Sequence, residues 1–172
     1  MMAWLRLLQD LVDALQSGRD PAGLSGAAAL GLFMGLVPGW PLQVWVAGLV
    51  LLVFDFELTL AGLAFLAGAA LGWLLDPALD AAGAWLLAHP ALQDLWTTLY
   101  GQSAWRLTRF HNSVVLASTL LGLILLVPLD LLLKALLRRY LAAWRERLGF
   151  LRWLRPLDAL RRWIQRLQGA GA

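Results

Sequence analysis

The sequence predicts an all-α integral membrane protein: a re-entrant or broken helical hairpin, two full transmembrane helices, and amphipathic interfacial helices at both termini. Hydrophobic residues make up 60% of the 172 residues and charged residues 15%, whereas a soluble domain is about half apolar and about a quarter charged. The stretch 22–54 carries no charge and is interrupted by Pro38-Gly39-Trp40-Pro41. Two further apolar segments, 58–75 and 113–133, are each long enough to cross a bilayer.

Residues 1–19 are expected to form an N-terminal amphipathic helix. Trp4, Leu8, Leu11 and Leu15 recur at helical spacing, with polar residues between them. Acidic residues interrupt this first apolar stretch and no small-residue cleavage site follows it. The segment therefore does not have the pattern of a signal peptide.

The stretch 22–54 is expected to form the hairpin that opens a membrane domain over residues 20–133. One straight helix of this length would run to roughly 50 Å, beyond a ~30 Å hydrocarbon core, whereas arms of about 24 Å and about 20 Å are short for crossing. Broken helices of this kind need protein or water to cover their freed backbone groups, and they recur in transporters. The sequence leaves open whether the hairpin is re-entrant or spans twice. Gln43, just after the turn, is expected either to bond a freed backbone group or to line a polar path.

Small residues mark two faces where helices can approach closely. Gly31 and Gly35 lie four residues apart on the first arm, and Gly68 and Gly72 lie four apart on the span 58–75. Asp76-Pro77 is expected to end that span, with Asp76 capping the next helix. Short outer helices over 77–111 and the last span, 113–133, complete the domain.

The positive charge gathers at the C-terminus. Residues 134–172 hold ten basic and two acidic side chains, a net charge of +8, while the first 133 residues carry −5. Leu and Trp interleave with these arginines, which predicts a basic amphipathic tail on an anionic leaflet rather than a nucleic-acid-binding segment. Since excess Lys and Arg resist translocation, both termini are expected in the cytoplasm and residues 76–112 outside.

One polar cluster favours binding of an anion. It stands at the outer start of the last span and comprises Arg106, Arg109, His111, Asn112 and Ser113. A helix start presents unpaired N–H groups and partial positive charge, and a neighbouring arginine makes it suited to a lipid phosphate. The alternative is that the arginines only reach to the interface and that Asn112 or Ser113 only caps the helix.

Nothing in the sequence indicates catalysis. There is no cysteine, and no nucleophile–base pattern, phosphate-binding glycine loop or metal-ligand spacing. We therefore expect no enzyme activity, no cofactor and no metal. Asp55 and Glu57, between apolar segments, suit either a solvated cytoplasmic turn or, with His111, a proton-coupled carrier. Asp130 is expected to pair with Lys134, four residues on.

Two strings carry a resemblance to known proteins. The hairpin string Ala27–Pro38 (AAALGLFMGLVP) and the string Leu107–Leu116 (LTRFHNSVVL) are similar to those of an uncharacterised bacterial inner-membrane family with a Gly/Pro re-entrant hairpin, over roughly residues 20–135. The second string has His111 and Ser113 where that family usually has Asn and Thr. The hairpin also resembles, more distantly, a domain of unknown function that is sometimes fused to glycosyltransferases.

The resemblance implies a bacterial inner-membrane protein that is often encoded beside a large, bridge-like (AsmA-like) envelope protein. We expect a subunit of a lipid-transport complex that passes phospholipid, or another lipid phosphate, to an envelope-spanning partner. Its partners would be membrane lipids and a larger membrane or periplasmic protein, with a homo-oligomer left open and no nucleic acid. The alternatives are a docking subunit that anchors a partner's transmembrane helix through the glycine faces, and an ion- or proton-coupled carrier.

Overall fold

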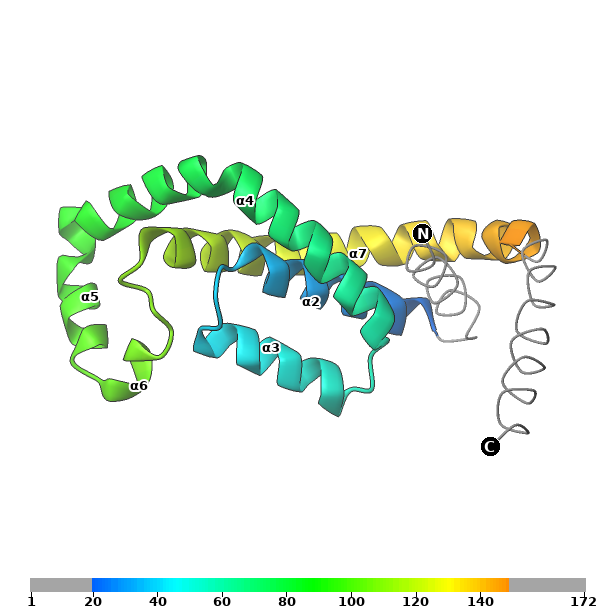
Figure 1. Cartoon of the computed structure of the whole chain (residues 1–172), viewed down its shortest axis with the longest axis horizontal. Helices are drawn as coiled ribbons and strands as arrows, with labels where there is room; N and C mark the ends of the chain where they lie inside the picture. The colour runs from blue at the N-terminus through cyan, green and yellow to red at the C-terminus, as the bar shows by residue number, and fades with distance from the viewer. Residues whose placement is uncertain (1–19, 149–172) are drawn as a thin grey trace, which may run out of the picture.

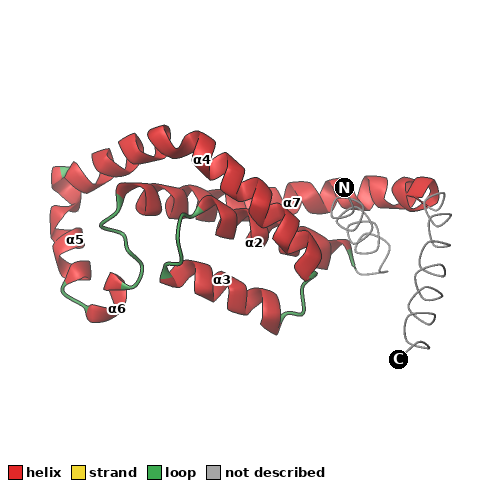
Figure 2. Ribbon diagram, viewed as in Figure 1, coloured by secondary structure: helices red, strands yellow, loops and turns green. Residues whose placement is uncertain are grey.

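The computed structural model describes residues 20–148, and every regular element in that range is a helix (Figure 2). The all-α class is therefore confirmed. The elements are α2 (Pro21–Leu36), α3 (Leu42–Val53), α4 (Leu58–Ala88), the short 3-10 helix η1 (Pro90–Leu92), α5 (Gln93–Tyr100), α6 (Ser103–Arg106) and α7 (Ser113–Leu148). The amphipathic helix predicted for residues 1–19, and the basic tail beyond residue 148, lie outside the described residues.

Helix α2 is the centre of the fold. It packs most extensively against α4, then against α7, and least against α3 (Figure 1). The core around the end of α2 joins three helices, and its buried residues are Phe33, Val37, Val44, Ala47 and Val115. This core holds the hairpin turn against the first turns of α7.

The glycines of α2 and α4 face each other. A Cβ atom added to Gly31 would overlap the carbonyl oxygen of Ala61, and one added to Gly35 would overlap that of Phe65. In the reverse direction, a Cβ on Gly68 would overlap the carbonyl oxygen of Leu32. Only glycine permits so close a backbone approach. The two small-residue faces therefore pack against each other within the chain.

Helix α4 differs from its predicted form, because it does not end at Asp76-Pro77. It continues to Ala88 with Pro77 inside it, and Figure 1 shows it as an arch over the other helices. Proline removes one helical hydrogen bond and bends the helix. Packing beyond the proline offsets that cost, since Leu79 is buried and Gly83 lies against the backbone of Ser113.

Helix α7 is also longer than predicted. It runs from Ser113 to Leu148 through Pro128, so the boundary predicted between a span ending at 133 and a tail starting at 134 lies inside one continuous helix. The ranges Leu58–Ala88 and Ser113–Arg139 are long and apolar enough to cross a membrane, and only 11% and 6% of their most apolar windows are buried. Most of each window is therefore not buried within residues 20–148.

Contacts along α2 determine which part of α7 lies beside each end of the hairpin. At the start of α2, Ser25 Oγ donates a hydrogen bond of 2.6 Å to Asp130 Oδ1, a partner other than the predicted Lys134. At its end, Val37 packs in one core with Val115. Helix α3 then runs back, and Phe56 reaches Gly26 near the start of α2. Both ends of the hairpin therefore lie near Asp130, and its turn lies beside the beginning of α7.

Candidate functional site

The loop between α6 and α7 is tied to the hairpin turn. The backbone N–H of Leu42 donates to the carbonyl oxygen of Leu107 at 3.0 Å. Gln43 Nε2 donates to the carbonyl oxygen of Thr108 at 3.2 Å and to Thr119 Oγ1 at 2.9 Å. Gln43 thus satisfies a backbone group of the loop rather than one freed by the hairpin prolines. Its Oε1 is buried and has no hydrogen-bond partner among the described residues.

Arg109 lies against the hairpin turn. Its Nη1 is 3.5 Å from the position that a Cβ atom on Gly39 would occupy. Gly39 has a φ of 79°, and Arg109 itself has a φ of 56°. The left-handed region is open to glycine but costs an arginine about 1 kcal/mol. Residues held in such strain cluster at functional sites, and the guanidinium of Arg109 has no carboxylate partner within the described part of the chain.

Arg106 and His111 belong to a different group of contacts. Arg106 Nε donates to the carbonyl oxygen of Tyr100 at 3.4 Å, and the rings of Tyr100 and His111 meet edge to face with centroids 6.0 Å apart. Burial raises the pKa of the Tyr100 phenol, whose hydroxyl has no hydrogen-bond partner among the described residues. The structure therefore divides the predicted cationic cluster, and Arg109 alone of its two arginines reaches the turn.

The start of α7 is capped by Asn112, whose Oδ1 accepts a hydrogen bond from the backbone N–H of Val115 at 3.0 Å. Ser113 has another role, since its hydroxyl donates to Asp80 Oδ1 on α4. This bond holds the two helices together beside the turn. One of the unpaired N–H groups at this helix start is thus satisfied by the cap.

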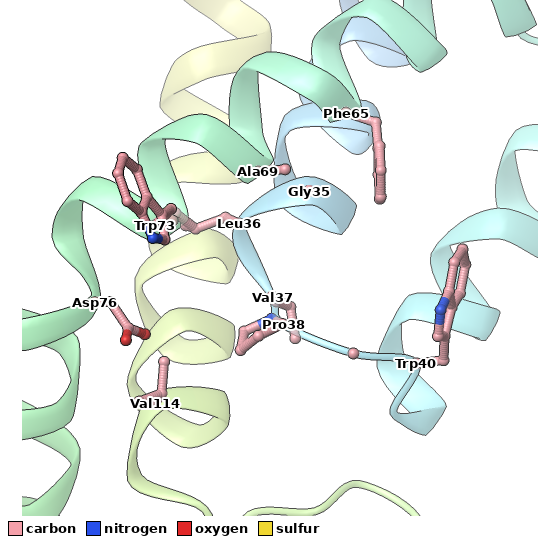
Figure 3. A pocket seen from close by; sticks show the side chains of 12 residues that line it. Gly35, Leu36, Val37, Pro38, Trp40, Phe65, Ala69, Trp73, Asp76 and Val114 are labelled. Atoms are coloured by element: carbon pink, nitrogen blue, oxygen red, sulfur yellow. The ribbon is translucent and has the colours of Figure 1, made fainter.

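A cavity of about 330 Å³ opens beside the turn. Figure 3 shows it bounded by the end of α2, the turn, α4 and Val114 of α7. Its lining includes Trp40, whose ring stacks on Phe65 at 6.3 Å, and Trp73, whose side chain is 84% exposed. Asp76 is the single ionisable residue of the lining, and Figure 3 shows its side chain pointing from α4 toward Val114.

The sequence did not reveal Asp76 as a lining residue. Its position before Pro77 resembles a helix cap, and only the continuity of α4 places it inside a helix. The partners of Gln43, Thr108 and Thr119, were missed as well, because contacts between residues so far apart leave no local pattern. Asp55 and Glu57 lie in the connection between α3 and α4, at the opposite end of the hairpin from His111, so the structure does not bring these three together.

Fold and site together define a class: a small all-α protein in which two apolar helices of membrane-spanning length flank a helical hairpin with an arginine at its turn. The chain belongs to the family described as "Uncharacterized protein conserved in bacteria (DUF2062)", which it matches over residues 5–145. Membership of an uncharacterised bacterial family is thereby confirmed. The chain is 32% identical over 127 residues to an "Uncharacterized protein" of Treponema pallidum (strain Nichols), which covers 72% of this chain and 76% of that protein. No solved structure matches the chain significantly.

Proposed function

We propose that the protein is a non-enzymatic subunit of the bacterial inner membrane that holds the phosphate of a lipid at the hairpin turn and passes the lipid to a larger, envelope-spanning partner. Helices α4 and α7 act as the spans, the α2–α3 hairpin enters and leaves on the cytoplasmic side, and both termini are cytoplasmic. The position of Arg109 carries this proposal.

Arg109 supports phosphate binding because its guanidinium stands at the turn without a carboxylate partner in the described range. A guanidinium presents five donors in a planar fork that matches phosphate oxygens. The loop keeps this group in a strained backbone conformation, at a φ of 56°. Strain of this kind persists where the surrounding contacts hold it, and here the bonds from Leu42 and Gln43 anchor the loop.

The lengths of the hairpin helices support a role in moving lipid. With 16 and 12 residues, α2 and α3 are about 24 Å and about 18 Å long, less than the ~30 Å of a hydrocarbon core. Helix α3 also presents large exposed side chains, among them Trp45 at 64%. A short hairpin beside two long spans thins the bilayer locally, which shortens the path of a lipid that leaves the membrane.

The docking alternative is less well supported. It assigns the faces at Gly31/Gly35 and Gly68/Gly72 to a partner's helix, and these faces pack against each other within the chain. The carrier alternative needs Asp55, Glu57 and His111 in one path, and these residues lie at opposite ends of the hairpin.

Native mass spectrometry of the purified full chain tests the proposal by counting the phospholipids that it retains. We expect Arg109→Ala to reduce retention about three- to tenfold, because it removes charge-assisted hydrogen bonds at a partly solvated site. Arg109→Gly should reduce retention equally while relieving the strained φ, so loss of binding with undiminished thermal stability excludes unfolding as the cause. Arg106→Ala is the matched control, since that side chain bonds to Tyr100. Equal retention by wild type and both Arg109 variants would refute the proposal.

A further inference from the structure

Asp76 is a charged group that the proposed phosphate site does not use. It lies inside α4, one residue before Pro77, so it caps no helix. Within the described residues its carboxylate has neither a hydrogen-bond nor an ion-pair partner.

The carboxylate of Asp76 has no cationic partner among the residues that line the cavity. The cavity lining contains no basic side chain, and its walls are mostly apolar or aromatic. Arg109 lies against Gly39, which lines the same cavity. Arg109 and Asp76 form no ion pair with each other among the described residues. Gly39 therefore lies beside the guanidinium of Arg109 and also lines the cavity that contains the carboxylate of Asp76. Neither charged group has an ion-pair partner among the described residues.

We propose that this site selects a phospholipid whose headgroup carries both a phosphate and a primary amine. Arg109 binds the phosphate, and Asp76 accepts hydrogen bonds from the ammonium group. The inference rests on the proposed function and extends it from lipid phosphates in general to amine-bearing ones. A headgroup that carries a phosphate but no amine would leave the Asp76 carboxylate without a cationic partner. It would also bring a second negative charge near that carboxylate, which is unfavourable.

Two features of α4 next to Asp76 support recognition of an ammonium group. Pro77 has no N–H, so the carbonyl oxygen of Trp73 lacks its usual helical donor and is available as a second acceptor. Trp73 is also one of the residues that line the cavity, and an indole face attracts cations. A primary ammonium has three donors, enough to bond both the carboxylate and this carbonyl.

Competition between two lipids tests the inference. The full chain in detergent micelles is offered equal amounts of phosphatidylethanolamine and phosphatidylglycerol with identical acyl chains, and bound lipids are counted by native mass spectrometry. We expect the wild type to retain the amine lipid about three- to fivefold over the other, a modest ratio because Asp76 is solvent-exposed. Asp76→Asn should bring this ratio to about one without reducing the retention of phosphatidylglycerol. Asp94→Asn, on α5, makes the same change in net charge and should keep the wild-type ratio.

The two proposals fail in different ways. Equal retention of both lipids by the wild type, or a ratio that Asp76→Asn leaves unchanged, overturns the amine assignment even where Arg109→Ala lowers retention of both. Retention that Arg109→Ala leaves unchanged overturns the phosphate site itself. Soluble phosphoethanolamine separates lipid from free headgroup: we expect little displacement of lipid at equal concentration, and complete displacement would overturn the assignment to a lipid.

Discussion

Ser25 Oγ lies 2.6 Å from Asp130 Oδ1, and this hydrogen bond joins the start of α2 to α7 across 105 positions of the sequence. Ser25 is fully buried, and its partner is a carboxylate in an apolar helix. The bond fixes the register of α2 along α7. It thereby sets the level at which the hairpin turn meets the loop that carries Arg109.

Loss of this bond should destabilise the fold. We expect Ser25→Ala to lower the free energy of unfolding by about 1–2 kcal/mol, since it leaves the Asp130 carboxylate without its donor. Denaturant unfolding in detergent, followed by circular dichroism, measures the change. Ser118→Ala is the control, because Ser118 is equally buried but bonds only to Val115 within its own helix. Equal losses in the two variants would mean that the interhelical bond adds nothing.

The packing of α2 on α4 makes a second prediction. Gly35→Ala should destabilise the protein by about 1–3 kcal/mol, because the new methyl group would overlap the Phe65 carbonyl oxygen and force the helices apart. Gly62→Ala, on α4, has open space around its Cβ and should be neutral or stabilising by up to about 1 kcal/mol. Thermal unfolding of both variants in one detergent measures the difference. A tolerated Gly35→Ala would contradict the close α2–α4 contact.

Gln43 should keep the loop closed over the turn. We expect Gln43→Leu, which removes the donors to Thr108 and Thr119, to accelerate maleimide labelling of a cysteine at Thr108 about five- to tenfold. The native chain has no cysteine, so the introduced thiol is the only one labelled. A second probe, Ala61→Cys, is buried in a different cluster, with Ala27 and Leu51, and should label at an unchanged rate. Parallel acceleration at both probes would show general loosening instead.

Tyr100 should make stability fall at alkaline pH. Burial raises its pKa above the ordinary value of 10.0, so the folded state holds the phenolic proton at a pH where the unfolded state has lost it. Its contribution to stability is therefore complete below pH 10.0 and is lost as pH rises through the higher folded value. Ultraviolet titration of tyrosinate in a Tyr140→Phe background measures the shift, and an ordinary pKa for Tyr100 would contradict its burial.

Much of the fold can be predicted from the sequence because its signals are local. The broken apolar stretch gives a helical hairpin with its turn at residues 37–41, and helical spacing marks the small-residue faces. The spacing does not indicate which helix packs against each small-residue face. Gly31 and Gly68 offer the same pattern to a neighbouring helix of the chain as to a separate protein, and only the folded chain shows that these faces pack together.

The site is harder to predict from the sequence, because tertiary packing there outweighs the local conformational preferences of the residues. Pro77 normally ends a helix, yet packing of Gly83 against Ser113 carries α4 past it and turns Asp76 from a cap into a cavity residue. The sequence does predict that Arg109 is a cation near the start of a helix. Its approach to Gly39 depends on a positive φ in the loop, which no sequence pattern specifies for an arginine.

The position of the lipid headgroup tests the central claim most directly. The full chain is reconstituted in vesicles with a phospholipid that carries a photoreactive group on its headgroup, and the crosslinked residues are mapped by mass spectrometry. The account predicts crosslinks concentrated at the turn 38–41 and the loop 109–112, and their loss in Arg109→Ala. Crosslinks spread evenly over the exposed faces of α3, α4 and α7, and unchanged in that variant, would contradict it.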